Sequence, residues 1–143
     1  MNTPLVSPKV RPTSDTTART SGRFARAGLV AGVCAAVVNL AVVAIAHASD
    51  VSLEVGGEAI PLIAFPQMTL FAAVIGVGLA AVLVRRTRWP RSVFLTVTIG
   101  LSALSLLPPV LVHTDTATRL VLELTHLVAA FLVIPAIASR LAD

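Results

Sequence analysis

The sequence is poor in charged residues and in recognisable chemical motifs. Only 13% of its 143 residues are Asp, Glu, Lys or Arg, against about 25% in ordinary globular domains. Cys34 is the single cysteine, so no internal disulfide can form and a thiol-redox enzyme is not favoured. There is no phosphate-binding glycine loop, GxSxG turn or HExxH helix. These absences remove the usual sequence signatures of nucleotide-binding proteins, serine hydrolases and zinc proteases.

Apolar residues, in contrast, are abundant and lie in blocks. They make up 56% of the chain, and the mean hydropathy is +0.90. Four blocks, at about 27–48, 60–84, 93–112 and 117–139, are each close to the ~20 residues that a helix needs to cross ~30 Å of hydrocarbon. A β-barrel would show alternating segments of ~10 residues, which are missing. The predicted fold is therefore all-α, a bundle of four transmembrane helices spanning residues 26–140.

The first 25 residues differ in composition from the rest. They are rich in Pro, Thr, Ser and Arg and have few large apolar side chains. Such a segment buries too little apolar surface to offset the entropy lost on ordering. We expect residues 1–25 to be a disordered cytoplasmic tail.

Basic residues are distributed asymmetrically between the predicted loops. Ten of the eleven Lys and Arg residues lie before the first apolar block, in the loop 85–91 or at Arg140, and Arg119 is the exception. Because cytoplasmic loops carry the excess of Lys and Arg, this distribution predicts a multi-pass protein of the plasma (inner) membrane with both termini in the cytoplasm. The formal charge of +4 therefore reflects topology, and nucleic acid is not expected as a partner.

An alternative for the first block is a cleaved signal peptide. Ala46–Ser49 ("AHAS") fits an A-x-A cleavage site, with cleavage after Ala48. The apolar run of about 20 residues is longer than the usual ~7–15 of a signal sequence, which favours an uncleaved helix. Both alternatives stay open from the sequence.

Three local patterns concern the ends and contacts of the helices. Gly56-Gly57, after an alternating stretch, favours a short hairpin between the first two helices. The Gly28-x-x-x-Gly32 spacing allows close helix packing, more plausibly within the chain than in a homodimer. Pro66 either kinks the second helix or marks its start, and Pro108-Pro109 should break the third.

Polar residues of all four predicted helices fall at a similar depth in the outer half of the membrane. At ~1.5 Å per residue they lie about 9–16 Å below the outer surface. Unpaired polar groups are costly there, so these side chains should face one another. The candidate polar or ligand layer consists of Asn39, Gln67, Ser105, Arg119, Glu123 and His126.

The polar layer supports several interpretations. Glu123-x-x-His126 is half of the di-metal carboxylate pattern of helix bundles, but the other ligands are missing, so no metal and no other cofactor is predicted. An intramembrane pair of ionisable residues can form a proton relay or a ligand pocket. A hydrogen-bonded clasp with Asn39 and Gln67 is the structural alternative, slightly favoured. No catalytic residue is assigned.

Four features together carry a resemblance to a known kind of protein. They are Asn39, the basic loop Arg85–Arg91, "LSALSLLPP" at Leu101–Pro109 and "TATRLVLELTHLVAA" at Thr116–Ala130. In their order the chain, from about Arg26 to Arg140, resembles a family of small bacterial integral membrane proteins with four helices. That family has no assigned activity, and some members carry a cell-envelope label. The resemblance implies a fold and a location, and it transfers no catalytic role to any residue.

Two classes of function therefore remain. The first is a non-enzymatic envelope protein, acting as a scaffold, as a partner subunit or as a binder of a small ligand or lipid. The second is a proton-coupled transporter or a membrane enzyme that uses Glu123 and His126. The expected partners are the lipid bilayer and either a second copy of the chain or another membrane protein.

Overall fold

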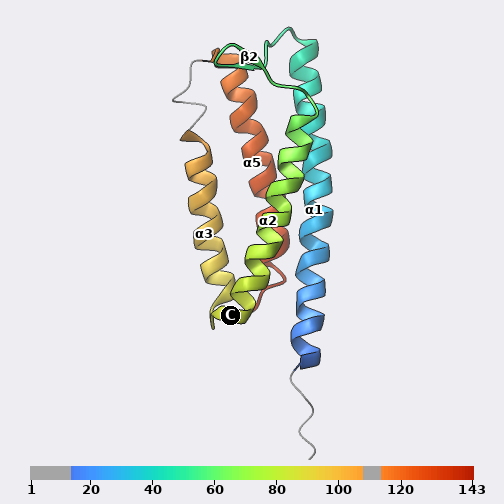
Figure 1. Ribbon diagram of the computed structural model, residues 1–143, viewed down its shortest axis with the longest axis vertical. Helices are drawn as coiled ribbons and strands as arrows, with labels where there is room; N and C mark the ends of the chain where they lie inside the picture. The colour runs from blue at the N-terminus through green and yellow to red at the C-terminus, as the bar shows by residue number, and fades with distance from the viewer. Residues whose placement is uncertain (1–13, 108–113) are drawn as a thin grey trace, which may run out of the picture.

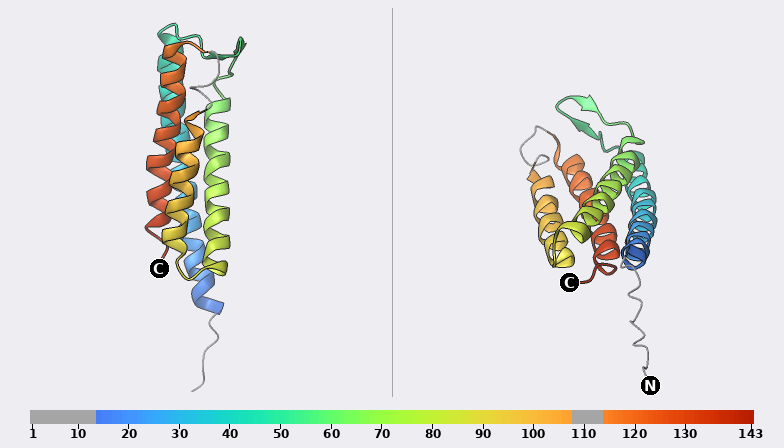
Figure 2. Two further views of the ribbon diagram at one scale, coloured as in Figure 1. Left: turned by 90° about the vertical axis from the view of Figure 1, so that its left-hand side faces the viewer. Right: turned by 60° about the horizontal axis from the view of Figure 1, so that its bottom comes forward.

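The computed structural model describes residues 14–107 and 114–143, with side chains described from residue 22 onward. Its elements are α1 (Ser14–Ala48), β1 (Glu54–Val55), β2 (Glu58–Ala59), α2 (Ala64–Arg86), α3 (Pro90–Ser105) and α5 (Thr116–Ala138). The helices run along one long axis, and the small hairpin lies across one end of them (Figures 1 and 2). The prediction of an all-α protein is confirmed.

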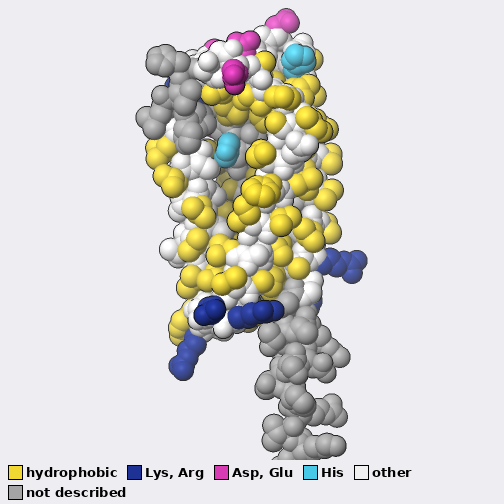
Figure 3. Space-filling model, in the orientation of Figure 1, with side chains coloured by type: hydrophobic (Ala, Val, Ile, Leu, Met, Phe, Trp, Pro, Cys, Tyr) yellow, Lys and Arg dark blue, Asp and Glu magenta, His cyan; other side chains and the backbone are white. Residues whose placement is uncertain are grey.

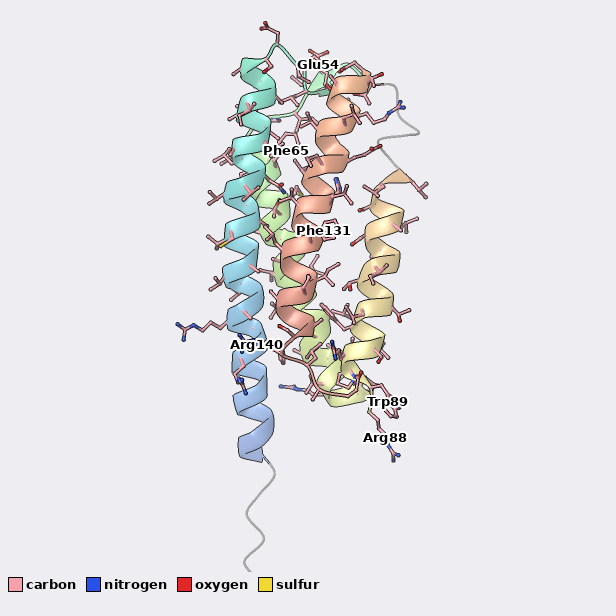
Figure 4. All side chains as sticks on the ribbon, turned by 180° about the vertical axis from the view of Figure 1, so that it is seen from behind. Glu54, Phe65, Arg88, Trp89, Phe131 and Arg140 are labelled. Atoms are coloured by element: carbon pink, nitrogen blue, oxygen red, sulfur yellow. The ribbon has the colours of Figure 1, made fainter. Side chains whose placement is uncertain are left out.

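The two ends of the bundle carry opposite charge (Figure 3). The hairpin end holds Asp50, Glu54, Glu58 and Asp115, and we call it the acidic end. The other end, here the basic end, holds Arg85, Arg86, Arg88, Arg91 and Arg140. Figure 4 shows Glu54 at the first of these ends, and Arg88 beside Trp89 at the second. Between the two ends, hydrophobic side chains predominate on the face shown in Figure 3.

Three helices are long and apolar enough to cross a membrane. They cover residues 22–48, 64–86 and 116–138, with hydropathies of 2.6, 2.2 and 2.2. Large apolar side chains point outward from all three, for example Val37, Phe71 and Phe131 at 63%, 62% and 75% exposure. Such a surface suits lipid rather than water. α3 is not among the three, because its 16 residues are fewer than the ~20 that a span requires.

The first helix begins earlier than the sequence analysis predicted. α1 starts at Ser14, whereas residues 1–25 were expected to be disordered. Once a helix has formed, each added residue costs little, and no proline interrupts the chain between Ser14 and Ala48. Phe24 is 1% exposed and belongs to the core with Phe94 and Ile137. The packed domain therefore includes residues assigned to the tail, while residues 1–13 lie outside the described chain.

Prolines lie at the starts of α2 and α3. α2 starts at Ala64, four residues later than predicted, and Pro66 occupies its first turn, where no intrahelical N–H is needed. α3 begins with Pro90 at its first position and ends at Ser105, short of the predicted residue 112. The predicted break at Pro108-Pro109 lies outside the described residues.

Glycines let α1 approach its neighbours closely. A Cβ on Gly32 would lie 2.5 Å from the Cβ of Ala73 in α2. A Cβ on Gly28 would lie 2.6 Å from Val77 and 2.8 Å from Ile137, so it would clash with both α2 and α5. The GxxxG pattern therefore serves packing within the chain, as the sequence analysis favoured.

The hairpin is confirmed, and it closes the acidic end. β1 and β2 pair antiparallel, with Gly56 and Gly57 at φ values of 63° and 84° in the turn between them. Leu53 also has a positive φ, 50°, which is unfavourable for a leucine, but its side chain is 2% exposed and packs with Val43 and Phe65. Burial of this side chain therefore fixes the hairpin over the helices.

Asp115 joins the hairpin segment to α5. Its carboxylate accepts hydrogen bonds from the backbone N–H groups of Ala117 and Thr118 and from the hydroxyl of Ser52, at 2.9, 3.0 and 3.0 Å. Hydrogen bonds from the side chain and from the backbone N–H of Thr118, with smaller contributions from Ser52 and Ala117, lower the pKa of Asp115 to about 2. At the basic end Asp143 caps α3 in the same way, accepting from the backbone N–H and the hydroxyl of Ser92.

Candidate functional site

Asn39 connects three helices in the half of the bundle nearer the acidic end. Its side chain is 1% exposed. The amide nitrogen Nδ2 donates to the hydroxyl of Thr69 in α2 at 2.9 Å and to the backbone carbonyl of Thr125 in α5 at 3.1 Å. Both of these partners are acceptors here, because the Thr69 hydroxyl gives its own hydrogen to the Phe65 carbonyl. This arrangement requires the nitrogen of the amide, and not its oxygen, to face Thr69 and Thr125.

The amide oxygen of Asn39 consequently points away from Thr69 and Thr125. Oδ1 is buried and has no hydrogen-bond partner among the described residues. Asn39 borders a cavity of about 340 Å³ between α1, α2 and α5, together with Phe65, Thr69, Thr125 and His126. A buried acceptor without a partner costs about 1–3 kcal/mol. This cost offsets part of the stability that the bonds from Asn39 to Thr69 and Thr125 contribute.

A second cavity, which we call the cleft, lies between α2 and α3 with α5 as its floor. Its volume is about 340 Å³. Small residues make room for it, notably Ala72 and Gly76 of α2 and Ala129 and Ala130 of α5. The face of the molecule in Figure 3 is hollowed in the half nearer the acidic end, and a histidine side chain lies in the hollow. The cleft is therefore open toward the surface that lipid would cover.

His126 borders the cleft, the Asn39 cavity and a third cavity of about 430 Å³ along α3 and α5. Its ring nitrogen Nδ1 lies 2.7 Å from the Leu122 carbonyl of its own helix. A carbonyl oxygen only accepts, so Nδ1 carries a hydrogen in this contact. In the neutral ring the other nitrogen, Nε2, then presents a lone pair, so it acts as an acceptor.

Hydroxyl groups supply the other polar atoms of the cleft. Three of them donate to carbonyls of their own helices: Thr69 to Phe65 at 2.8 Å, Thr98 to Phe94 at 2.7 Å and Ser105 to Ser102 at 2.7 Å. Such bonds within a helix satisfy the hydroxyl hydrogen without a partner from another helix. The lone pairs of the Thr98 and Ser105 hydroxyls remain available as acceptors, whereas the Thr69 hydroxyl already accepts from Nδ2 of Asn39.

The structure distributes the six predicted layer residues among different surroundings. It brings Ser105 and His126 together on the cleft, and it places Asn39 in the adjoining cavity. Gln67 lies on an exposed face of α2. Arg119 and Glu123 are half-buried, and they precede His126 by two turns and one turn of α5. His126 bonds to its own helix, and Asn39 bonds to residues outside the predicted layer.

Thr69 and Thr125 are the partners that the sequence analysis missed. A signal was present in α2, where the buried residues Phe65, Thr69, Ala73 and Ala80 follow a helical spacing of four, four and seven. Gln67 does not fall on that stripe. Gln67 was predicted as a partner of Asn39 from its depth in the membrane alone. The position of Thr69 around the helix axis makes Thr69 the actual partner.

Metal binding finds no support in residues 14–107 and 114–143, where no group of three or more His, Cys, Asp and Glu side chains could hold an ion.

Comparison with known proteins gives a family but no activity. No curated protein and no solved structure matches the chain. A family profile described as a family of unknown function, DUF6069, matches residues 19–143. The match begins within α1 and includes the hairpin segment, α2, α3 and α5, so it covers every residue of the candidate site. The chain therefore belongs to the DUF6069 family.

Proposed function

We propose that this protein spans the plasma (inner) membrane four times. α2 ends at the basic end, and α5 begins at the acidic end, where Asp115 and Thr114 bond to Ser52 and the Glu54 carbonyl. If α2 and α5 both cross the bilayer, residues 87–115 must cross it as well in order to connect them. α3, with 16 residues, covers most of that path, about 24 Å at ~1.5 Å per residue.

The orientation that we propose follows from the charges. The basic end faces the cytoplasm, because Lys and Arg accumulate on the cytoplasmic side of membrane proteins. Both termini are then cytoplasmic, and the hairpin and the acidic end face outward. The Asn39 cavity then lies in the outer half of the membrane, and the cleft extends from His126, near the middle of α5, toward the cytoplasmic end.

Within this topology we propose that the protein is a non-enzymatic binder of a small lipid-like molecule. The supporting observation is the cleft itself, which has apolar walls and which gathers Ser105 and His126 toward the acidic end. Binding sites for small molecules are mostly apolar with a few placed polar groups. An amphiphile could insert its chain along α5 and leave its headgroup near His126.

The second candidate function is a proton relay in a transporter or enzyme. It is favoured by one observation, namely that Glu123 and His126 lie three positions apart on α5, with His126 on the cleft. Glu123→Gln separates the two functions, because it removes a proton carrier and leaves the cleft lining unchanged. Loss of pH-driven flux in proteoliposomes would favour the relay, and retained ligand binding would favour the binder.

Photolabelling tests the binding function. The full chain in phospholipid nanodiscs is labelled with a ten-carbon alkyl probe that carries a diazirine, and the labelled peptides are identified by mass spectrometry. We expect saturable labelling on the facing sides of α2, α3 and α5. Ala130→Leu, which fills the cleft, should abolish the saturable part. Ala44→Leu, an equal change on the exposed side of α1, should leave it unchanged. Even, non-saturable labelling around the whole apolar surface would refute the proposal.

A further inference from the structure

We propose that the cleft between α2 and α3 selects a single-chain amphiphile with an uncharged, hydrogen-bond-donating headgroup, such as a long-chain alcohol or a monoacylglycerol. This inference rests on the proposed binding function and adds the chemical class of the ligand. Its basis is that nearly all polar atoms around the cleft accept hydrogen bonds and have no hydrogen to donate.

His126 is the central acceptor. Its Nδ1 hydrogen is engaged by the Leu122 carbonyl at 2.7 Å, so Nε2 of the neutral ring offers only a lone pair. Because His126 borders the cleft, a ligand headgroup that pairs with Nε2 there must supply the hydrogen.

Most hydroxyls around the cleft also have no free hydrogen to donate to a ligand. Those of Thr69, Thr98 and Ser105 direct their hydrogens to the backbone carbonyls of Phe65, Phe94 and Ser102. The Thr69 oxygen also accepts from Nδ2 of Asn39, so Thr98 and Ser105 are the two of these side chains that offer free lone pairs to a ligand. Ser102, which also borders the cleft, is the one hydroxyl there whose hydrogen has no partner within the described chain. The polar lining therefore carries several acceptors and one available hydroxyl hydrogen.

An acceptor-rich lining discriminates between headgroups. A hydroxyl or amide N–H pairs with it directly, whereas a carboxylate or an ether brings further acceptors and no hydrogen. A buried polar group that finds no partner is strongly disfavoured, so headgroups without a donor should bind less well.

The dimensions of the cleft indicate a short single chain. Along α5 it extends from His126 to Ile134, and along α2 from Thr69 to Leu79. These stretches are about 12 and 15 Å long at ~1.5 Å per residue. A carbon chain with bonds of about 1.5 Å advances about 1.25 Å per carbon. A chain of roughly ten carbons would therefore extend from the headgroup at His126 to the far end of the cleft.

Competition experiments in nanodiscs test the donor requirement. The photoprobe is 1-decanol with a diazirine in the chain, and the competitors are 1-decanol, its methyl ether and decanoate, compared at equal mole fraction in the bilayer. We expect decanol to displace the probe from the cleft peptides at a concentration about three- to tenfold lower than the ether, the factor expected from one neutral hydrogen bond. Decanoate should compete no better than the ether.

Variants identify the acceptor. His126→Phe keeps an aromatic ring and removes Nε2, so the preference for decanol over the ether should fall to about one while the ether competes as before. Ser105→Ala should reduce the preference in the same direction. Thr96→Val is the matched control, because the Thr96 hydroxyl also bonds to a carbonyl of α3 but the residue does not line the cleft. It should leave the preference unchanged.

The possible results separate the two proposals. Equal competition by decanol and the ether would refute the donor requirement and leave the binding function standing. Stronger competition by decanoate would also refute it and would assign the cleft to an anionic headgroup. Labelling that no competitor displaces would refute the binding function itself.

Discussion

Substitutions of Asn39 test whether its side chain is a clasp that faces two acceptors. The Nδ2 group makes two bonds to other helices, one to Thr69 and one to Thr125, and each such bond in a membrane protein is worth about 0.6 kcal/mol on average and up to about 1.7. Asn39→Leu therefore loses about 1–3 kcal/mol. It also removes the buried Oδ1 acceptor that has no partner among the described residues, which returns about 1–3 kcal/mol. The two contributions nearly cancel, so we expect the leucine variant to lie within about 1–2 kcal/mol of the wild type.

Asn39→Asp keeps the shape of the side chain, but we expect it to destabilise the protein strongly. An ionised carboxylate has no hydrogen for either acceptor, and a protonated one has a single hydrogen. At least one oxygen then faces an acceptor in a buried site, with a cost of about 1–3 kcal/mol for each unsatisfied group. We expect a loss of at least about 2–4 kcal/mol, clearly larger than for leucine.

Unfolding of the two variants and the wild type can be compared by titration with dodecyl sulfate in mild-detergent micelles. The expected order of stability is wild type and Asn39→Leu close together, with Asn39→Asp well below. Equal destabilisation by leucine and aspartate would refute the assignment of two acceptors opposite Nδ2. An aspartate variant as stable as the wild type would do the same.

Three further predictions concern topology, close packing and capping. In a Cys34→Ala background, cysteines at Glu54 and Asp115 should react with an impermeant thiol reagent added to intact cells, and a cysteine at Thr87 should not; labelling at Thr87 would reverse the proposed orientation. Gly32→Ala should lower the stability by about 1–3 kcal/mol because the new Cβ would lie 2.5 Å from Ala73, whereas Gly78→Ala, which meets nothing within 4 Å, should be tolerated; equal melting temperatures would contradict the close approach of α1 and α2. Asp115→Ala should lower the melting temperature at neutral pH and remove a pH dependence of stability. Because the pKa of Asp115 is lowered from 3.8 to about 2 in the folded protein, its contribution to stability is fully present above pH 3.8 and is lost as the pH falls through about 2. Identical acid unfolding curves for the variant and the wild type would argue against the cap.

The sequence by itself determined the helices, the hairpin and the charge polarity of this protein. Each of these depends on local signals. Apolar blocks require internally bonded backbone, Gly56-Gly57 provides the positive φ values of a tight turn, and the arginines of the loop 85–91 mark one end. Local signals were less reliable at helix ends. α1 extends toward the N-terminus as far as Ser14, because no proline interrupts the chain between Ser14 and Ala48.

Only the tertiary structure decided which polar side chains meet. Their positions in the sequence put Asn39, Gln67 and His126 at one depth, but depth does not specify direction around a helix axis. Packing of α1 against Ala73 turns the stripe of Thr69 toward Asn39 and leaves Gln67 on the exposed face. The cleft likewise depends on the distance between α2 and α3, which is set by side-chain packing across helices distant in sequence. Its acceptor-rich lining follows from the hydrogens that Thr69, Thr98 and Ser105 give to their own helices, a choice among rotamers that only the folded surroundings determine.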